Sequence, residues 1–89
     1  MREITIDCSG IREREQLHDA FAQALSFPKH YGKNLDALHD CLTSLCEETR
    51  LELKHWDAVE AALGRYAIGT RRALIHSVSG NPLLTVIFD

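Results

Sequence analysis

The chain has 89 residues, of which 45% are hydrophobic and 26% are charged, and its formal net charge at pH 7 is −3. This length and composition predict one folded domain over residues 1–89 with a single core, and they exclude an intrinsically disordered chain. The acidic balance argues against nucleic acid as a partner, because a surface of that sign repels polyphosphates.

The cysteines Cys8, Cys41 and Cys46 are odd in number and include no CxxC pair. This usage argues against a disulfide framework and against a structural zinc site, so a reducing cytoplasm is the expected compartment. The chain carries no recognisable export signal, and its longest apolar runs, such as residues 86–88, are far too short to cross a bilayer. We therefore expect a cytoplasmic protein without a membrane partner.

The first third of the chain predicts a strand followed by a helix. Residues 2–7 alternate charged with β-branched side chains, which is the pattern of a half-buried strand. From about 13 to 25, apolar residues recur at helical spacing with polar residues on the other side, and Pro28 is expected to stop this amphipathic helix. The loop "FPKHYGK" after it is expected to form a fixed, partly exposed turn.

A second helix is predicted from Leu35 to about Glu47. Asn34 is the expected cap of this helix, and Asp36 lies in the first turn, where the helix dipole favours a negative charge. Its leucines gather on one stripe and are expected to bury the helix against a sheet.

The second half of the chain predicts a strand at 50–56, two helices at about 57–66 and 70–80, and a final strand at 83–89. A glycine, Gly64 or Gly69, is expected to separate the two helices. The last strand is continuously apolar, which is typical of a strand buried on both faces. The order β-α-α-β-α-α-β favours an α/β fold with a small three-stranded parallel sheet, about four helices and right-handed crossovers.

Acidic residues are unpaired in the predicted second helix, since no lysine or arginine occurs from position 34 to 49. Asp36, Asp40, Thr43 and Glu47 share one face of this helix, opposite the leucines. A solvated helix face is the ordinary explanation for such a run of charge. The other explanation is electrostatic complementarity to a basic cleft, which would justify a surface that lacks stabilising i,i+4 partners.

An enzyme or a metal site is not expected from the same helix. His39, Asp40 and Cys41 are consecutive, and neighbouring helical residues point about 100° apart, so they cannot form a hydrogen-bonded triad among themselves. Asp36 and His39 lie at i and i+3, but two ligands do not make a physiological metal site. We therefore expect neither catalysis nor a cofactor.

The stretch "FPKHYGKNLDALHDCLTSL", residues 27–45, resembles the barstar family of intracellular ribonuclease inhibitors. The chain length, the "LH" pair at 17–18 and the predicted element order agree with that family. The resemblance implies the barstar fold, a three-stranded parallel sheet packed with helices. It also implies that the chain is a monomer when free and plugs the active-site cleft of a small secreted ribonuclease of the barnase type in a 1:1 complex.

The resemblance also implies which residues meet the enzyme. Asp40 would take the place of the substrate phosphate, because a carboxylate can accept charge-assisted hydrogen bonds from the arginine, lysine and histidine of such a cleft. Asp36 would be a second acidic contact on the same face. The remaining implied contacts surround these two: His30, Gly32, Asn34, Leu35, His39, Thr43 and Leu45.

The chain departs from the family pattern at several of these positions. His30 stands where the family usually has an aromatic ring, and His39 and Leu45 stand where the best-known member has tryptophan. The last predicted helix offers Arg71 and His76 in place of acidic residues that supplement the interface in that member. These differences support an alternative function, a barstar-fold adaptor or immunity protein that binds a different basic toxin or partner protein.

Overall fold

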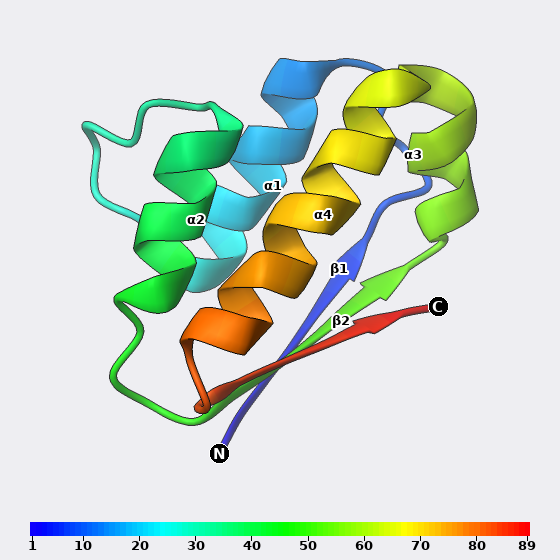
Figure 1. The fold of residues 1–89 in the computed structure, drawn as a ribbon. Coiled ribbons are helices and arrows are strands. Elements are labelled where there is room, and N and C mark those ends of the chain that lie inside the picture. The colour runs from blue at the N-terminus through cyan, green and yellow to red at the C-terminus, as the bar shows by residue number, and fades with distance from the viewer.

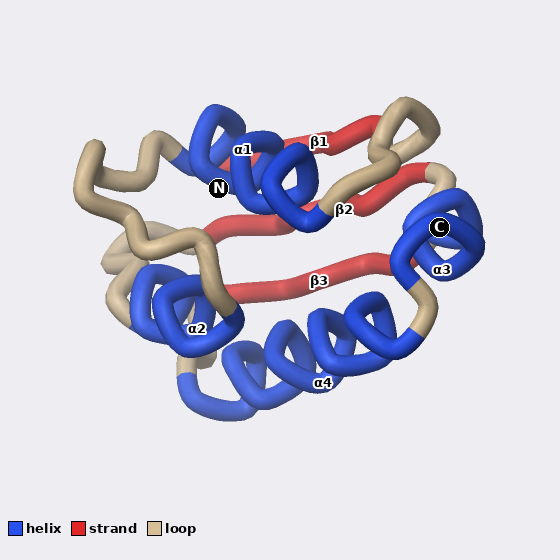
Figure 2. The backbone as a smooth tube through the Cα atoms, turned by 90° about the horizontal axis from the view of Figure 1, so that it is seen from above, coloured by secondary structure: helices blue, strands red, loops and turns tan.

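The computed structural model describes residues 1–89 and contains three strands and four helices in the predicted order. Their bounds are β1 Arg2–Asp7, α1 Arg14–Leu25, α2 Leu35–Thr43, β2 Thr49–Lys54, α3 Trp56–Leu63, α4 Arg65–Gly80 and β3 Leu84–Phe88. The strands form one parallel sheet in the order β1-β2-β3 (Figures 1 and 2). The predicted α/β class and element order are therefore confirmed.

The sheet is covered on one face only. Along β2, Leu51 and Leu53 are buried while Arg50 and Lys54 are exposed, and Figure 1 shows α1, α2 and α4 gathered on one side of the strands. Right-handed crossovers between strands that follow one another across the sheet place all the connecting helices on the same face. The other face is left to solvent.

The expectation that the last strand is buried on both faces is wrong. β3 lies at an edge of the sheet, and Thr85 on its open face is exposed while Ile87 is half-buried. Its helix-covered face carries Leu84, which is buried, and Val86. The continuous apolar run therefore belongs to an edge strand that packs next to α4. It does not indicate a strand with helices on both faces.

Helix α2 packs against α4, and its leucines face the core that the sheet and helices share, as predicted. Leu38 and Leu42 are fully buried in the core cluster of 16 residues. Leu35 approaches α4 so closely that a Cβ atom on Gly69 would stand 3.2 Å from its Cδ1. Gly69 thus permits the contact between the two helices, and the break between α3 and α4 falls at Gly64, whose φ is +54°.

The second helix is shorter than predicted, because its last turn is capped from another part of the chain. Asn81, which follows α4, donates its side-chain amide to the carbonyl oxygens of Leu42 at 2.9 Å and Leu45 at 3.1 Å. Glu47 consequently lies outside the helix and pairs with Arg2 at 3.9 Å. Glu47 is therefore not part of the acidic face of α2, contrary to the prediction.

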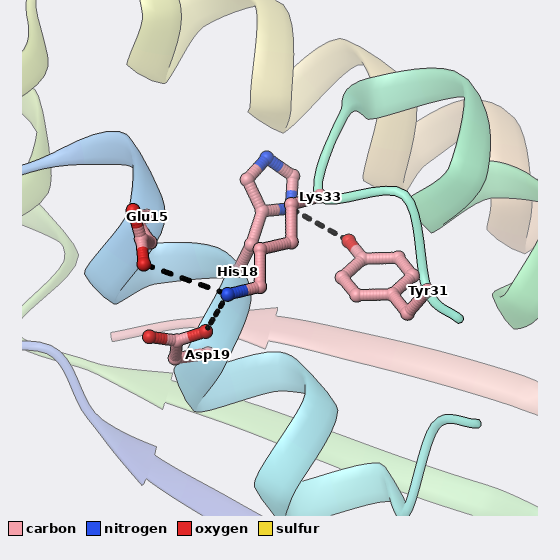
Figure 3. A network of polar contacts seen from close by, with 5 residues as sticks. All are labelled: Glu15, His18, Asp19, Tyr31 and Lys33. Carbon is pink, nitrogen blue, oxygen red and sulfur yellow. Dashed lines mark hydrogen bonds and ion pairs between the residues drawn. The ribbon is translucent and has the colours of Figure 1, made fainter. Parts of the chain in front are cut away.

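A buried polar network joins α1, the loop that follows it, and α4. His18 of α1 is fully buried, and its two ring nitrogens each lie 2.6 Å from a tyrosine hydroxyl, Nδ1 from Tyr31 and Nε2 from Tyr66. Figure 3 shows the contact with Tyr31. Burial lowers the pKa of His18, which favours the neutral ring. A neutral imidazole has one donor and one acceptor, so one tyrosine donates and the other accepts.

The lone tryptophan is a core residue. Trp56 is only 2% exposed, and its ring packs edge-on against Phe88 with 5.2 Å between the ring centroids. Tyr31 is also buried, at 8% exposure, although it lies in a loop. None of the helices is both long enough and apolar enough to cross a membrane.

Replacing Tyr31 by phenylalanine will test the network. The ring will keep its packing against Phe27, but Nδ1 of His18 will be buried without a partner. An orphaned buried polar group of this kind costs about 1–3 kcal/mol, so the free energy of unfolding in urea should fall by that amount. A loss below about 0.5 kcal/mol, typical of an ordinary surface change, would contradict the assigned hydrogen bond.

The same histidine will make stability depend on pH. Burial lowers the pKa of folded His18, so below the ordinary histidine pKa of about 6.5 the unfolded chain binds more protons than the folded chain. The free energy of unfolding should therefore decrease as pH falls through about 6.5 toward the folded-state pKa. Urea titrations at about pH 7.5 and 5.5, which bracket that value, will measure the decrease.

Two histidine variants serve as matched controls for this pH dependence. His18→Gln should flatten it, whereas His76→Gln, at an exposed position of α4, should leave it as in the parent. An equal decrease in all three proteins would assign the effect to other groups.

Candidate functional site

The residues predicted to meet a partner lie in the loop between α1 and α2 and on α2 itself. Figure 1 shows this loop and α2 together at one side of the molecule, away from α3. The exposed members of the set are His30, Gly32, Asn34, Asp36 and Asp40, and the half-buried members are Leu35, His39, Thr43 and Leu45.

Asn34 begins α2 and shapes the end of the loop, as predicted. Its side-chain oxygen accepts a hydrogen bond from the backbone amide of Ala37 at 2.8 Å, which satisfies one of the free amides of the first turn. Its side-chain nitrogen donates to the carbonyl of Gly32 at 3.3 Å. One residue thus fixes both the start of the helix and the loop before it.

Lys33 ties the loop to α1 from the outside. Its ammonium group lies 2.9 Å from the carboxylate of Asp19 and 3.6 Å from that of Glu15, as Figure 3 shows. The hydrogen bond to Asp19 raises the pKa of Lys33. Its φ of +50° is in the left-handed region, which non-glycine residues adopt only where the surrounding contacts enforce it. Buried Tyr31 anchors the loop to α1, and the exposed ion pairs of Lys33 add a weaker restraint.

Asp36 and Asp40 are exposed on α2, and neither takes part in any of the four ion pairs of the structure. They lie at i and i+4, where like charges on one helix face repel each other slightly. The sequence-based prediction that these carboxylates lack a cationic partner within the chain is confirmed. Their negative potential is therefore directed outward, where it would attract a cationic surface.

Two of the predicted contacts, His39 and Leu35, face α4 instead of lying with the aspartates. The Nδ1 atom of His39 lies 3.0 Å from the hydroxyl of Ser77 on α4. Leu35 reaches the backbone of Gly69. The structure therefore does not bring these two side chains together with Asp36 and Asp40, and both help to hold α2 in position.

Thr43 uses its hydroxyl within α2. Its Oγ1 donates to the carbonyl oxygen of His39 at 2.8 Å, and Asp40 offers a second carbonyl at 3.2 Å. Its methyl group approaches α4, since a Cβ atom on Gly80 would stand 3.2 Å from it. This close contact fixes the C-terminal end of α2 against the end of α4.

Asp40 also borders two surface hollows that the sequence-based reasoning missed. The larger has a volume of about 340 Å³ and lies between the end of α1 and the C-terminal half of α2. The smaller, of about 200 Å³, lies between the loop and α2. Both are bordered by Pro28, Asp40 and Cys41. Helical periodicity does not reveal such hollows, because their walls come from separate segments.

Cys41 does not have the environment of an activated nucleophile. Burial raises the pKa of Cys41, and the neighbouring charge of Asp40 raises it further. A thiol of this kind stays protonated at neutral pH, whereas a catalytic cysteine needs a lowered pKa. Across all 89 residues, no group of three or more His, Cys, Asp or Glu side chains is placed to hold a metal ion.

Comparisons with known proteins agree with the resemblance seen in the sequence. The family model described as "Barstar (barnase inhibitor)" matches residues 1–78. A protein of Bacillus subtilis (strain 168) named "Putative ribonuclease inhibitor YrdF" is 44% identical over 68 residues, which are 75% of this chain and 75% of that protein. The family match includes the whole loop and all of α2.

Changing the helix cap will test how the site is built. Asn34→Ala removes the acceptor of the Ala37 amide, so the free energy of unfolding should fall by about 1 kcal/mol. Asn34→Ser restores a capping oxygen and should recover most of that loss. Urea titration of both variants measures the effect, and equal stability of the alanine and serine variants would contradict the capping role.

Proposed function

The chain belongs to the barstar family, and from that membership we propose that it inhibits a small secreted ribonuclease of the barnase type by inserting α2 and the preceding loop into the active-site cleft. The observation that carries this proposal is the pair of exposed carboxylates, Asp36 and Asp40, which have no cationic partner in their own chain. The named relative, a ribonuclease inhibitor by its printed name, supports the same class of target.

The chemistry of a ribonuclease cleft suits such a surface. The enzyme must hold a phosphodiester and stabilise the negative charge that develops on it, so its cleft carries arginine, lysine and histidine. The carboxylate of Asp40 takes the position of that phosphate and accepts charge-assisted hydrogen bonds from these groups. Asp36, one turn earlier on the same helix, adds a second contact and favours rapid encounter with the cationic cleft.

The rigidity of the loop and helix supports tight binding. Tyr31 is anchored to His18, Lys33 to Asp19, and the last turn of α2 to Asn81. Binding therefore requires little further ordering of the inhibitor, and little of the interaction free energy is lost to conformational entropy. The inhibitor acts as a monomer in a 1:1 complex, without chemistry of its own, and protects the cytoplasm of the producing cell.

A second candidate function is an adaptor or immunity protein of the same fold that binds a different basic toxin. The observation that favours it is the orientation of His39, which contacts Ser77 of α4 instead of lying with Asp36 and Asp40. His30 is exposed in the loop and borders the smaller hollow together with Asp40. Inhibition of barnase together with failure to bind other toxins would reject this candidate.

Replacing Asp40 by alanine will test the proposed contact. Hydrogen bonds to charged groups contribute about 1.5–3 kcal/mol each, so losing two of them should weaken binding to barnase about a hundredfold or more. The inhibition constant is measured from cleavage of an RNA substrate at increasing inhibitor concentrations. Parent-like inhibition by Asp40→Ala would reject the role of this carboxylate.

Glu60→Ala is the matched control, because it removes one exposed carboxylate from α3 without changing α2. It should inhibit as the parent does. The association rate of the parent should also fall as salt is raised from about 0.05 to 0.5 M, since screening weakens long-range attraction between exposed charges. A rate insensitive to salt would contradict electrostatic steering.

A further inference from the structure

Asp40 stands on a ridge between the two hollows described above, rather than on a flat surface. The larger hollow, of about 340 Å³, has one wall from the end of α1 and the turn after it. Its other wall comes from the C-terminal half of α2, including Leu45. A cation paired with Asp40 would therefore have an open hollow directly beside it.

The walls of the larger hollow are mostly apolar. They contain Leu25, Phe27, Pro28 and Leu45, together with Cys41, whose thiol remains neutral because burial raises its pKa. The polar side chains that complete the lining are Asp40, Ser26 and Ser44. With one carboxylate at its border and no basic residue, the hollow is complementary to an apolar group that is accompanied by a positive charge.

The hollow is preformed. Leu25 is only 4% exposed and belongs to the core. The chain reverses at Ser26, which has a φ of +57°, and the amide of Phe27 donates to the carbonyl of Ala22 at 3.0 Å. On the other side, the carbonyl of Leu45 is held by Asn81. These contacts restrain the backbone of both walls.

We propose that this hollow is an anchor pocket of the interface and receives an apolar side chain from the rim of the ribonuclease cleft, next to the cation that Asp40 binds. The inference rests on the proposed function and specifies the partner surface further: an aliphatic or aromatic side chain adjacent to an arginine or lysine. A few anchor side chains that fill pockets on the partner commonly contribute most of the binding free energy of an interface. Phe27, Pro28 and Cys41 thereby join the residues that determine specificity.

Filling the hollow will test this proposal. Ser44 lies on its lining and is exposed, so Ser44→Trp places a large side chain where the partner's side chain would bind. The matched control is Ala61→Trp, which fills a hollow of about 400 Å³ bordered by Ser9, Arg12 and α3. The probe is barnase, and the dissociation constant is measured by titration with each variant.

We expect Ser44→Trp to raise the dissociation constant at least about tenfold, while Ala61→Trp binds as the parent does. Binding by Ser44→Trp within about twofold of the parent would overturn the anchor pocket. Circular dichroism and thermal unfolding establish that each variant is folded. If Ser44→Trp does not fold, Leu45→Asn, which replaces an apolar side chain of the wall by an amide, is measured instead. A dissociation constant raised at least about tenfold supports the anchor pocket, and one within about twofold of the parent overturns it.

The parallel measurement with Asp40→Ala separates the two proposals. If Asp40→Ala loses affinity and Ser44→Trp does not, the inhibitor function stands and the anchor pocket is rejected. If neither the parent nor any variant binds barnase, the proposed function fails and the pocket assignment fails with it. A second copy of this chain is the competing occupant, and a dimer in sedimentation that Ser44→Trp dissociates would overturn the proposal in favour of self-association.

Discussion

The handedness of the crossovers determines most of this structure. Three parallel strands that follow one another across a sheet through right-handed connections place their helices on one face. On that face α2 packs against α4 and buries Leu38 and Leu42 in the core. One long side of α2 therefore remains without a partner in the chain, and it is the side that carries Asp36 and Asp40.

The loop before α2 belongs to the proposed binding surface, and it is anchored by contacts with α1. His18 is buried between two tyrosines from different segments, and Lys33 pairs with α1 at the surface. At the other end of α2, the side-chain amide of Asn81 holds the carbonyl of Leu42. These residues contribute to recognition through the shape they maintain, because a preorganised surface loses little entropy on binding.

Two features of α2 suit a cationic cleft: the exposed charges of Asp36 and Asp40, and the hollow beside Asp40. In the proposed complex, the aspartates supply long-range attraction, and the apolar hollow beside Asp40 supplies a contact that depends on close fit. His39, which the sequence placed among the partner contacts, instead meets α4. The proposed binding surface therefore lies toward the turn at Phe27 and Pro28, away from the α4 side of the helix.

The sequence by itself determined the element types, their order, the Asn34 cap and the absence of a cation near Asp36 and Asp40, because each depends on local spacing and residue type. Tertiary structure alone decided where α2 ends, since its last carbonyls are satisfied by Asn81, 39 and 36 positions away. It also decided the edge position of β3 and the hollow beside Asp40. These features arise where distant segments meet, and periodicity within one segment does not reveal which segments those are.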